Sequence, residues 1–156
     1  MLVWRLCHRR LAAEAFSGKG AYLYGSRWTL PGSFVVYVAE TLSLAVLEVL
    51  VHLDSEVFPT SLVAMPAEIP EDIRIERVEF DALPDHWQQT PGPRDLQKIG
   101  TGWVREGQTA VLPVPSAIVS MERNFLLNPR HPDFSRILIN TPRPFSLDAR
   151  LVNTPP

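Results

Sequence analysis

The residues best suited to chemistry gather in the first third of the chain. Glu48 lies in Leu42–Leu53, a segment whose other residues are nearly all apolar. A carboxylate that leaves water without a partner costs free energy. This acid therefore needs either a structural cation or a cleft in which it does chemistry. Arg27 follows Gly25 in a glycine-flanked loop, and Tyr37 stands in a short apolar run.

Two more polar residues belong with this group, although they lie far away in the sequence. Arg5 follows Trp4 near the N-terminus, and Ser116 follows a Val-Pro pair. The residues alone leave two interpretations open for each. Arg5 either pairs with Glu48 as a structural cation or binds a ligand, and Ser116 is either a turn residue or a functional hydroxyl.

Familiar catalytic signatures are absent from the sequence. No glycine pattern matches a phosphate-binding loop or a dinucleotide-binding turn. The histidines and the single cysteine have no spacing that predicts a zinc site, and Ser116 lacks a serine-hydrolase elbow. Cys7 is the only cysteine, so an intrachain disulfide is excluded, and we interpret Cys7 as a small core residue.

Hydrophobic periodicity predicts the elements that must position these side chains. Alternation predicts a strand over Leu2–Leu6, and a β-branched and aromatic run predicts another over Phe34–Ala39. Apolar residues at spacings of three and four predict a buried helix over about residues 41–53. A second helix is predicted over Pro93–Arg105, with proline in its first turn and Gly107 ending it.

The remaining segments are mostly short and extended. Strands are predicted over Thr60–Ala67, Ile73–Phe80, Ala110–Val114 and Arg136–Asn140, with Ala117–Ser120 extended and Asn124–Pro132 a loop. Glycines on either side bracket Ala21–Tyr24 with flexible backbone. Regular helices do not separate these strands, which argues against a doubly wound parallel sheet. The sequence therefore predicts an α+β fold with a mixed or antiparallel sheet and few helices.

The composition limits the classes of partner. The chain has 156 residues, which indicates one domain, with a core over about residues 3–140 and a proline-rich tail. Its net charge of -2 gives no general attraction to nucleic acid. No apolar run is long enough to span a bilayer, and the N-terminus lacks the layout of a signal peptide. We therefore expect a cytoplasmic protein that contacts neither membrane nor nucleic acid directly.

Seven short motifs follow one another in a specific order from residue 3 to about residue 140. They are Val3–Leu6, Gly20–Trp28, Val36–Glu40, Leu44–Glu48, Leu83–Trp87, Val114–Ser116 and Asn124–Pro132. Each motif is weak alone, but the ordered set resembles the RES domain, a family named for its arginine, glutamate and serine. The resemblance extends over nearly the whole chain.

The resemblance implies a fold, an activity and a partner. RES proteins are toxins of bacterial type II toxin–antitoxin pairs, and their fold resembles that of ADP-ribosyltransferases. They consume NAD+ as a co-substrate, and no metal is expected. Some members hydrolyse or phosphorolyse NAD+, and some transfer ADP-ribose to a protein acceptor. The implied partner is an antitoxin with an Xre-like helix-turn-helix domain that covers the active cleft.

The resemblance also assigns roles to the polar residues. Cleavage of the nicotinamide–ribose bond builds positive charge on the ribose, which a carboxylate such as Glu48 stabilises. Arg5 and Arg27 match the arginines of the family, and guanidinium groups hold a pyrophosphate well. One of the two would hold phosphate while the other organises the ribose or the glutamate. Arg27 and Ser116 join Glu48 as the implied catalytic residues.

Other side chains are candidates for NAD+ binding. Tyr37 is the first choice to stack on nicotinamide, with Tyr24 or Trp28 behind it. Ser116 would bind the ribose or the nicotinamide amide, or hold the glutamate, and Asn124 is a weaker candidate. His52, one turn after the glutamate, is interpreted as a surface or supporting residue.

Structural and functional alternatives stay open at this point. Tyr37 could be a core residue with a satisfied hydroxyl, and Arg27 could stack on Trp28 at the surface. The chain could also be a toxin that acts without NAD+, by RNA cleavage or direct target binding, or a noncatalytic interaction module. The lack of a basic, aromatic strip argues against RNA. The acceptor of ADP-ribose, whether water, phosphate or a protein, stays undetermined.

Overall fold

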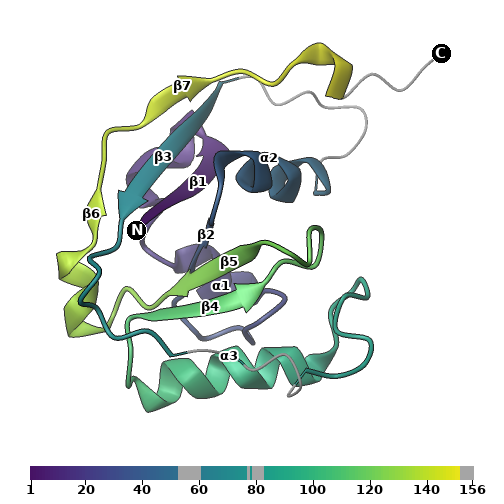
Figure 1. Ribbon diagram of the computed structural model, residues 1–156, viewed down its shortest axis with the longest axis vertical. Helices are drawn as coiled ribbons and strands as arrows, with labels where there is room; N and C mark the ends of the chain where they lie inside the picture. The colour runs from purple at the N-terminus through teal and green to yellow at the C-terminus, as the bar shows by residue number, and fades with distance from the viewer. Residues whose placement is uncertain (53–60, 77, 79–82, 152–156) are drawn as a thin grey trace.

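One curled antiparallel sheet organises the molecule (Figure 1). The computed structural model describes residues 1–52, 61–76, 78 and 83–151. The strands are β1 (Leu2–His8), β2 (Val36–Ala39), β3 (Leu62–Glu68), β4 (Val111–Pro115), β5 (Arg123–Leu127), β6 (Leu138–Ile139) and β7 (Arg143–Phe145). They lie in the order β4-β5-β2-β1-β3-β6, and β7 also pairs with β3. All these pairings are antiparallel, so the predicted α+β fold is confirmed.

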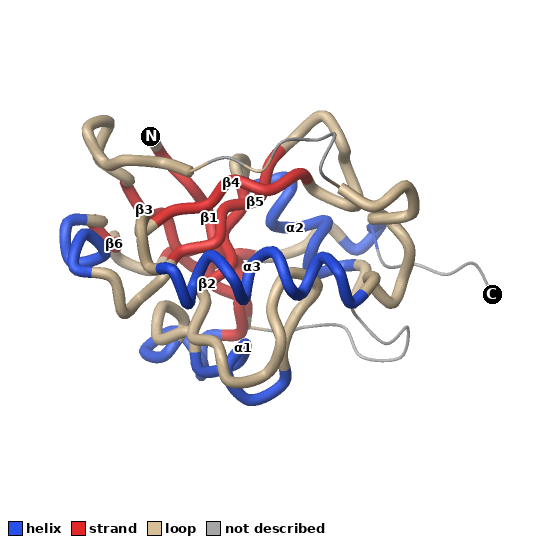
Figure 2. The backbone as a smooth tube through the Cα atoms, turned by 90° about the horizontal axis from the view of Figure 1, so that it is seen from below, coloured by secondary structure: helices blue, strands red, loops and turns tan. Residues whose placement is uncertain are grey.

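Three α-helices accompany the sheet (Figure 2). They are α1 (Lys19–Tyr24), α2 (Leu42–Leu50) and α3 (Arg94–Glu106), and short 3-10 helices cover Arg9–Glu14, Pro132–Arg136 and Ala149–Leu151. Within the described residues, none of these helices is both long and apolar enough to cross a bilayer.

Side-chain alternation along the strands builds the core on both faces of the sheet. One apolar cluster contains Val36 and Val38 of β2 together with strand residues on either side. On β4 and β5, alternate residues pack instead against Leu96 and Trp103 of α3. The buried residues of α2, Leu44, Ala45 and Val46, form one apolar cluster with residues of β1 and β3. The two predicted helices therefore each cover a different part of the sheet.

Local sequence signals explain where these two helices begin and end. The Thr41 hydroxyl accepts a hydrogen bond from the Leu44 N–H at the first turn of α2, with an O–N distance of 3.0 Å. Pro93 precedes α3, and Gly107 follows it in the left-handed conformation that favours glycine. The predicted end of α2 at Leu53 lies outside the described residues, and the helix ends at Leu50.

Two predictions about loops and strands are wrong. The segment over Asn124–Pro132 is not all loop, because Arg123–Leu127 forms β5 between β4 and β2. Its apolar residues are buried in the sheet, which outweighs the turn-forming residues that follow them. Ala21–Tyr24, for which the sequence predicts no element, lies in α1. Ala117–Ser120 bends into a turn between β4 and β5 instead of staying extended.

The predicted strand over Ile73–Phe80 is only partly described. Ile75 forms an isolated bridge with Val111, and no named strand includes the described residues of this range. Residues 77, 79 and 80 lie outside the described residues. The bridge places this segment beside β4, the edge strand of the sheet.

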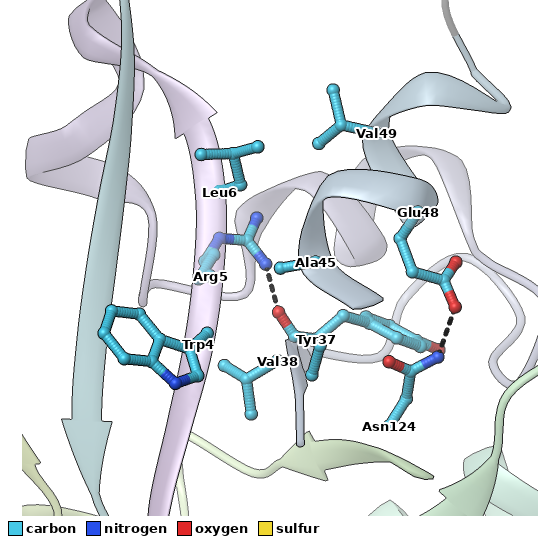
Figure 3. A pocket seen from close by; sticks show the side chains of 10 residues that line it. Trp4, Arg5, Leu6, Tyr37, Val38, Ala45, Glu48, Val49 and Asn124 are labelled. Atoms are coloured by element: carbon cyan, nitrogen blue, oxygen red, sulfur yellow. Dashed lines mark hydrogen bonds between the residues drawn. The ribbon is translucent and has the colours of Figure 1, made fainter. Parts of the chain in front are cut away.

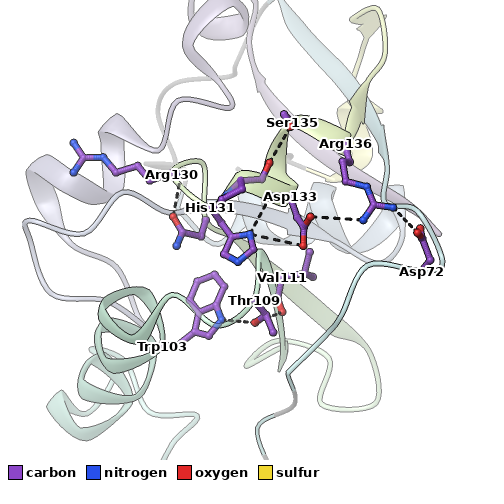
Figure 4. A network of polar contacts seen from close by, with 11 residues as sticks. Asp72, Trp103, Thr109, Val111, Arg130, His131, Asp133, Ser135 and Arg136 are labelled. Carbon is purple, nitrogen blue, oxygen red and sulfur yellow. Dashed lines mark hydrogen bonds and ion pairs between the residues drawn. The ribbon is translucent and has the colours of Figure 1, made fainter.

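A polar network fixes the segment that follows β5 (Figure 4). The His131 side chain accepts a hydrogen bond from the Asp133 N–H at 3.1 Å, which caps the short helix after it. Arg136 forms ion pairs with Asp133, at 3.6 Å, and with Asp72. Ion pairs this exposed contribute little to the stability of the fold. We therefore interpret this network as holding the segment after β5 in place, with little effect on the stability of the whole fold.

Candidate active site

A pocket opens where β1, β2 and α2 meet the start of β5 (Figure 3). Its lining consists of Trp4, Arg5, Leu6, Tyr37, Val38, Ala39, Ala45, Glu48, Val49 and Asn124. The volume is about 160 Å³, similar to the cavity of roughly 150 Å³ known to accept benzene. The pocket can therefore hold one ring-sized group, and a larger ligand would extend out of it.

The acidic wall of the pocket is formed by Glu48 and Asn124, and Ser116 bonds to Glu48 from behind. The Oε1 atom of Glu48 accepts a hydrogen bond from Ser116 Oγ at 3.1 Å and from Asn124 Nδ2 at 2.5 Å. Ser116 is buried, and its oxygen also accepts hydrogen bonds from two main-chain N–H groups of the following turn. Since a hydroxyl has one proton, these contacts direct that proton toward the carboxylate. One oxygen of Glu48 is thus fixed by two donors.

Arg5 forms the opposite, basic wall. Its Nη1 donates a hydrogen bond to the main-chain oxygen of Tyr37 at 2.7 Å. Its Nε is buried and has no hydrogen-bond partner in the described part of the chain. Burial lowers the pKa of the guanidinium, while the nearby Cys7 thiol has the opposite, smaller effect. Among the described residues Arg5 forms no ion pair with Glu48, so it is not the structural cation that could have paired with this acid.

The pairing of β1 with β2 explains the position of Arg5. These strands share a single register pair, Trp4 with Ala39, whereas β1 and β3 pair along their whole length. The Arg5 guanidinium donates to the carbonyl of Tyr37 beside this short ladder (Figure 3). A side-chain donor therefore satisfies a strand carbonyl next to the pocket.

Tyr37 contributes its ring to the pocket and its hydroxyl to a neighbouring turn. The hydroxyl forms a short hydrogen bond with Ser26 Oγ. Burial raises the pKa of Tyr37, and the hydrogen bonds to its hydroxyl partly offset that rise. The phenol is therefore neutral at physiological pH. Gln97 of α3 donates to the Ser26 carbonyl at 2.8 Å, so α3 holds this turn in place.

Arg27 lies beside the turn but does not line the pocket. Its Nη1 donates to the carbonyl oxygens of Trp87, at 3.0 Å, and Gln89, at 2.9 Å. Its Nη2 donates to the Thr90 hydroxyl at 3.3 Å. Trp28 is a buried core residue, so it offers no surface for Arg27 to stack on. Arg27 connects the turn to the loop that precedes α3.

The structure thus brings together five of the residues selected from the sequence. Arg5, Tyr37, Glu48 and Asn124 line the pocket, and Ser116 bonds to Glu48 behind it. Arg27, Tyr24 and Trp28 are not among the lining residues. The side chain of Tyr24 is 83% exposed and that of Trp28 is 2% exposed. His52 is exposed, and its Nδ1 lies 2.8 Å from the Glu48 carbonyl oxygen.

Sequence reasoning missed several apolar residues of the lining. The motif with Arg5 contains Trp4 without assigning it a role, and the helical periodicity predicts Ala45 and Val49 as core residues. The signal for Ala45 was present, because it lies three residues before Glu48 and so on the same face of the helix. No group of three or more metal-ligating side chains occurs among the residues that the structure describes.

Comparison with known proteins decides the family. The RES domain model matches residues 2–148. The chain belongs to the RES domain family. This RES domain is 39% identical over 153 residues to the Toxin Res of Photorhabdus laumondii, and the match covers 97% of each chain. It is 35% identical over 153 residues to the Prs ADP-ribosylating toxin of a Sphingobium species, covering 96% of this chain and 95% of the relative.

A solved structure supports the fold. The RES domain is similar to a chain of the Mycobacterium tuberculosis MbcT-MbcA toxin–antitoxin complex, with a TM-score of 0.75. The match covers 93% of this chain and 84% of the other at 13% sequence identity. At that identity the similarity shows a shared fold. The resemblance proposed from the seven motifs is confirmed by the family match and the relatives together.

Proposed function

We propose that this RES domain is a toxin that cleaves the nicotinamide–ribose bond of NAD+ and transfers ADP-ribose to an acceptor. One observation carries this proposal: a carboxylate fixed by two donors faces a ring-sized pocket that has a guanidinium on its opposite wall. The names of the relatives, which include an ADP-ribosylating toxin, support the same activity.

The reaction uses the acidic wall. As the glycosidic bond breaks, its electron pair leaves with neutral nicotinamide, and positive charge develops on the ribose carbon. Glu48 stabilises that charge, while Ser116 and Asn124 hold the carboxylate so that little reorganisation is needed. An acceptor then supplies an electron pair to the same carbon, and its proton is lost. The ring of Tyr37 would pack against the nicotinamide in the pocket.

The basic wall binds the substrate. In this proposal Arg5 donates a hydrogen bond to an oxygen of NAD+. Its buried Nε–H has no partner among the described residues, and NAD+ carries many acceptor oxygens. Arg27 acts on the substrate only indirectly in this proposal, because its guanidinium already holds the loop over residues 87–90. Tyr24 has no part in this proposal because it lies exposed outside the pocket. The reaction as proposed needs no metal.

The acceptor and the partner follow from the relatives. A protein acceptor is favoured, since one relative is named for ADP-ribosylating Prs, and water or phosphate would use the same electrophile. The partner is an antitoxin, by analogy with the toxin–antitoxin complex that shares this fold. We propose that this antitoxin has an Xre-like helix-turn-helix domain and covers the pocket.

The direct test is to incubate purified protein with NAD+ and measure free nicotinamide by chromatography. Parallel reactions contain buffer alone, phosphate, or cell extract, and mass spectrometry identifies ADP-ribose, its phosphate ester or a modified protein. Release of nicotinamide in any arm supports the proposal, and the second product identifies the acceptor. Absence of nicotinamide in all three arms contradicts NAD+ cleavage.

A further inference from the structure

The acidic wall is assembled from two distant parts of the chain, and something must fix their separation. Glu48 is on α2, whereas its donors Ser116 and Asn124 flank the turn between β4 and β5. Hydrogen bonds at 3.1 Å and 2.5 Å leave little tolerance for relative movement of these two parts. Main-chain pairing holds β5 to β2 but does not directly hold the turn to α2.

Glu122 contacts both parts at once. Its Oε2 accepts a hydrogen bond from the Thr41 hydroxyl at 2.8 Å, across 81 residues of sequence. Its main-chain oxygen accepts from the Ser116 N–H at 3.0 Å, and its own N–H donates to Val119 at 2.9 Å. Asn124 follows two residues later. The side chain of Glu122 thus reaches α2 while its main chain holds the first donor to Glu48.

Thr41 makes this contact specific. Its hydroxyl oxygen accepts the Leu44 N–H at 3.0 Å and so caps α2. Donation of its one proton to Glu122 directs the lone pairs toward that N–H. The carboxylate also lies at the N-terminal end of α2, where the helix dipole favours a negative charge. The start of the helix that carries Glu48 is therefore tied to the turn that carries Ser116.

A second tie runs parallel to the first but uses mostly main chain. The Glu40 N–H donates to the Arg123 carbonyl at 3.0 Å, and Glu40 Oε2 accepts from the Arg123 N–H at 3.0 Å. This pair aligns β5 with the end of β2. The contact from Glu122 to Thr41 joins the turn directly to the helix cap, and Glu122 itself does not line the pocket.

We propose that Glu122 is a positioning residue, which holds α2 and the β4–β5 turn at the separation that lets Glu48 accept from Ser116 and Asn124 together. This inference rests on the proposed cleavage of NAD+. Glu122 acts through Thr41 and the turn, so its loss affects the turnover of bound NAD+ more than the binding of NAD+.

The test measures nicotinamide release under steady-state conditions for Glu122→Ala and Glu122→Gln. We expect Glu122→Ala to lower kcat roughly tenfold or more while KM for NAD+ stays within about twofold, because misplaced catalytic groups reduce turnover steeply. Glu122→Gln keeps an acceptor oxygen for Thr41 and restores most of kcat. Thr41→Val removes the same contact and also the cap of α2, so it should lower kcat at least as much as Glu122→Ala, and the double variant should be no slower than Thr41→Val alone.

Glu68→Ala is the matched control. Glu68 also forms one long-range side-chain hydrogen bond, to Asn140 at 3.0 Å, but far along β3 at the other edge of the sheet. The Glu68→Ala variant should therefore leave kcat unchanged. If Glu122→Ala does not fold, Glu122→Gln and Thr41→Val, compared with Thr41→Ser, carry the test.

The outcomes separate the two proposals. An inactive wild-type protein would contradict NAD+ cleavage itself. An active wild-type protein with unchanged kcat in Glu122→Ala, or with a raised KM and unchanged kcat, would overturn the positioning role. Additive losses in the double variant would overturn it as well.

Discussion

The two walls of the pocket differ in how completely their polar atoms are satisfied. On the acidic wall, one oxygen of Glu48 has two side-chain donors, and the hydroxyl of Ser116 is itself oriented by the following turn. On the basic wall, Arg5 makes one hydrogen bond, to the Tyr37 carbonyl, and its buried Nε has none among the described residues.

This difference indicates separate tasks. A buried donor without a partner costs about 1–3 kcal/mol, which a ligand oxygen would recover on binding. A carboxylate that is already fixed needs no rearrangement when charge develops beside it. We therefore expect changes on the acidic wall to affect turnover and changes on the basic wall to affect substrate binding.

The largest effect is expected for Glu48→Gln. The amide keeps the shape of the side chain but removes the negative charge, so kcat should fall about 1,000-fold, in the range seen for loss of transition-state electrostatic stabilisation. Nicotinamide release measures kcat, and thermal unfolding checks that the fold is intact. A folded variant with at least a tenth of wild-type kcat would remove Glu48 from the mechanism.

Arg5→Lys should act mainly on binding. Lysine can still donate to the Tyr37 carbonyl but lacks the planar fork, so KM for NAD+ should rise about ten- to a hundredfold, as expected for lost hydrogen bonds to a charged group. Titration calorimetry with ADP-ribose measures affinity independently of turnover. If affinity is unchanged and only kcat falls, the assignment of binding to the basic wall is wrong.

Ser116→Ala should have an intermediate effect on kcat. It removes one of the two donors to Glu48 and leaves Asn124 in place, so kcat should fall about tenfold, near the value of one hydrogen bond to a charged group. Steady-state kinetics with ADP-ribose affinity as the control will separate turnover from binding. A loss as large as that of Glu48→Gln would show that the two donors act as one unit with the acid.

Arg27→Lys should have the smallest effect. Lysine cannot reach both carbonyl oxygens and the Thr90 hydroxyl, so the loop over residues 87–90 should exchange its amide hydrogens faster. KM for NAD+ should change only about threefold, in the range of a partly exposed charge. Hydrogen exchange and kinetics together provide the test. A rise in KM equal to that of Arg5→Lys would place Arg27 on the substrate as well.

Periodicity and propensity correctly predicted the elements that carry the site. The helix with Glu48 is recognisable from the helical spacing of its apolar residues and from Thr41 at its start, and the strand with Tyr37 from its β-branched and aromatic residues. The strand with Asn124 was missed. Its short apolar run precedes a segment rich in proline and polar residues, and only the pairing with β2 and β4 makes the run extended.

The site itself could be predicted only as a set of residues. The family motifs named Arg5 and Arg27 together, yet one lines the pocket and the other holds a loop. That distinction depends on which carbonyl oxygens come within reach after folding. The contact from Glu122 to Thr41 spans 81 residues, and no local pattern marks it.

The place where β1 and β2 separate has a consequence for the hydrogen bonding of the sheet. Beyond Trp4 and Ala39 the two strands share no further register pair, and the guanidinium of Arg5 satisfies the nearby Tyr37 carbonyl. Besides carrying a charge, the Arg5 side chain therefore lies where β1 and β2 part and replaces a main-chain donor there. Beside the pocket, the Tyr37 carbonyl is therefore satisfied by a side chain and not by a neighbouring strand.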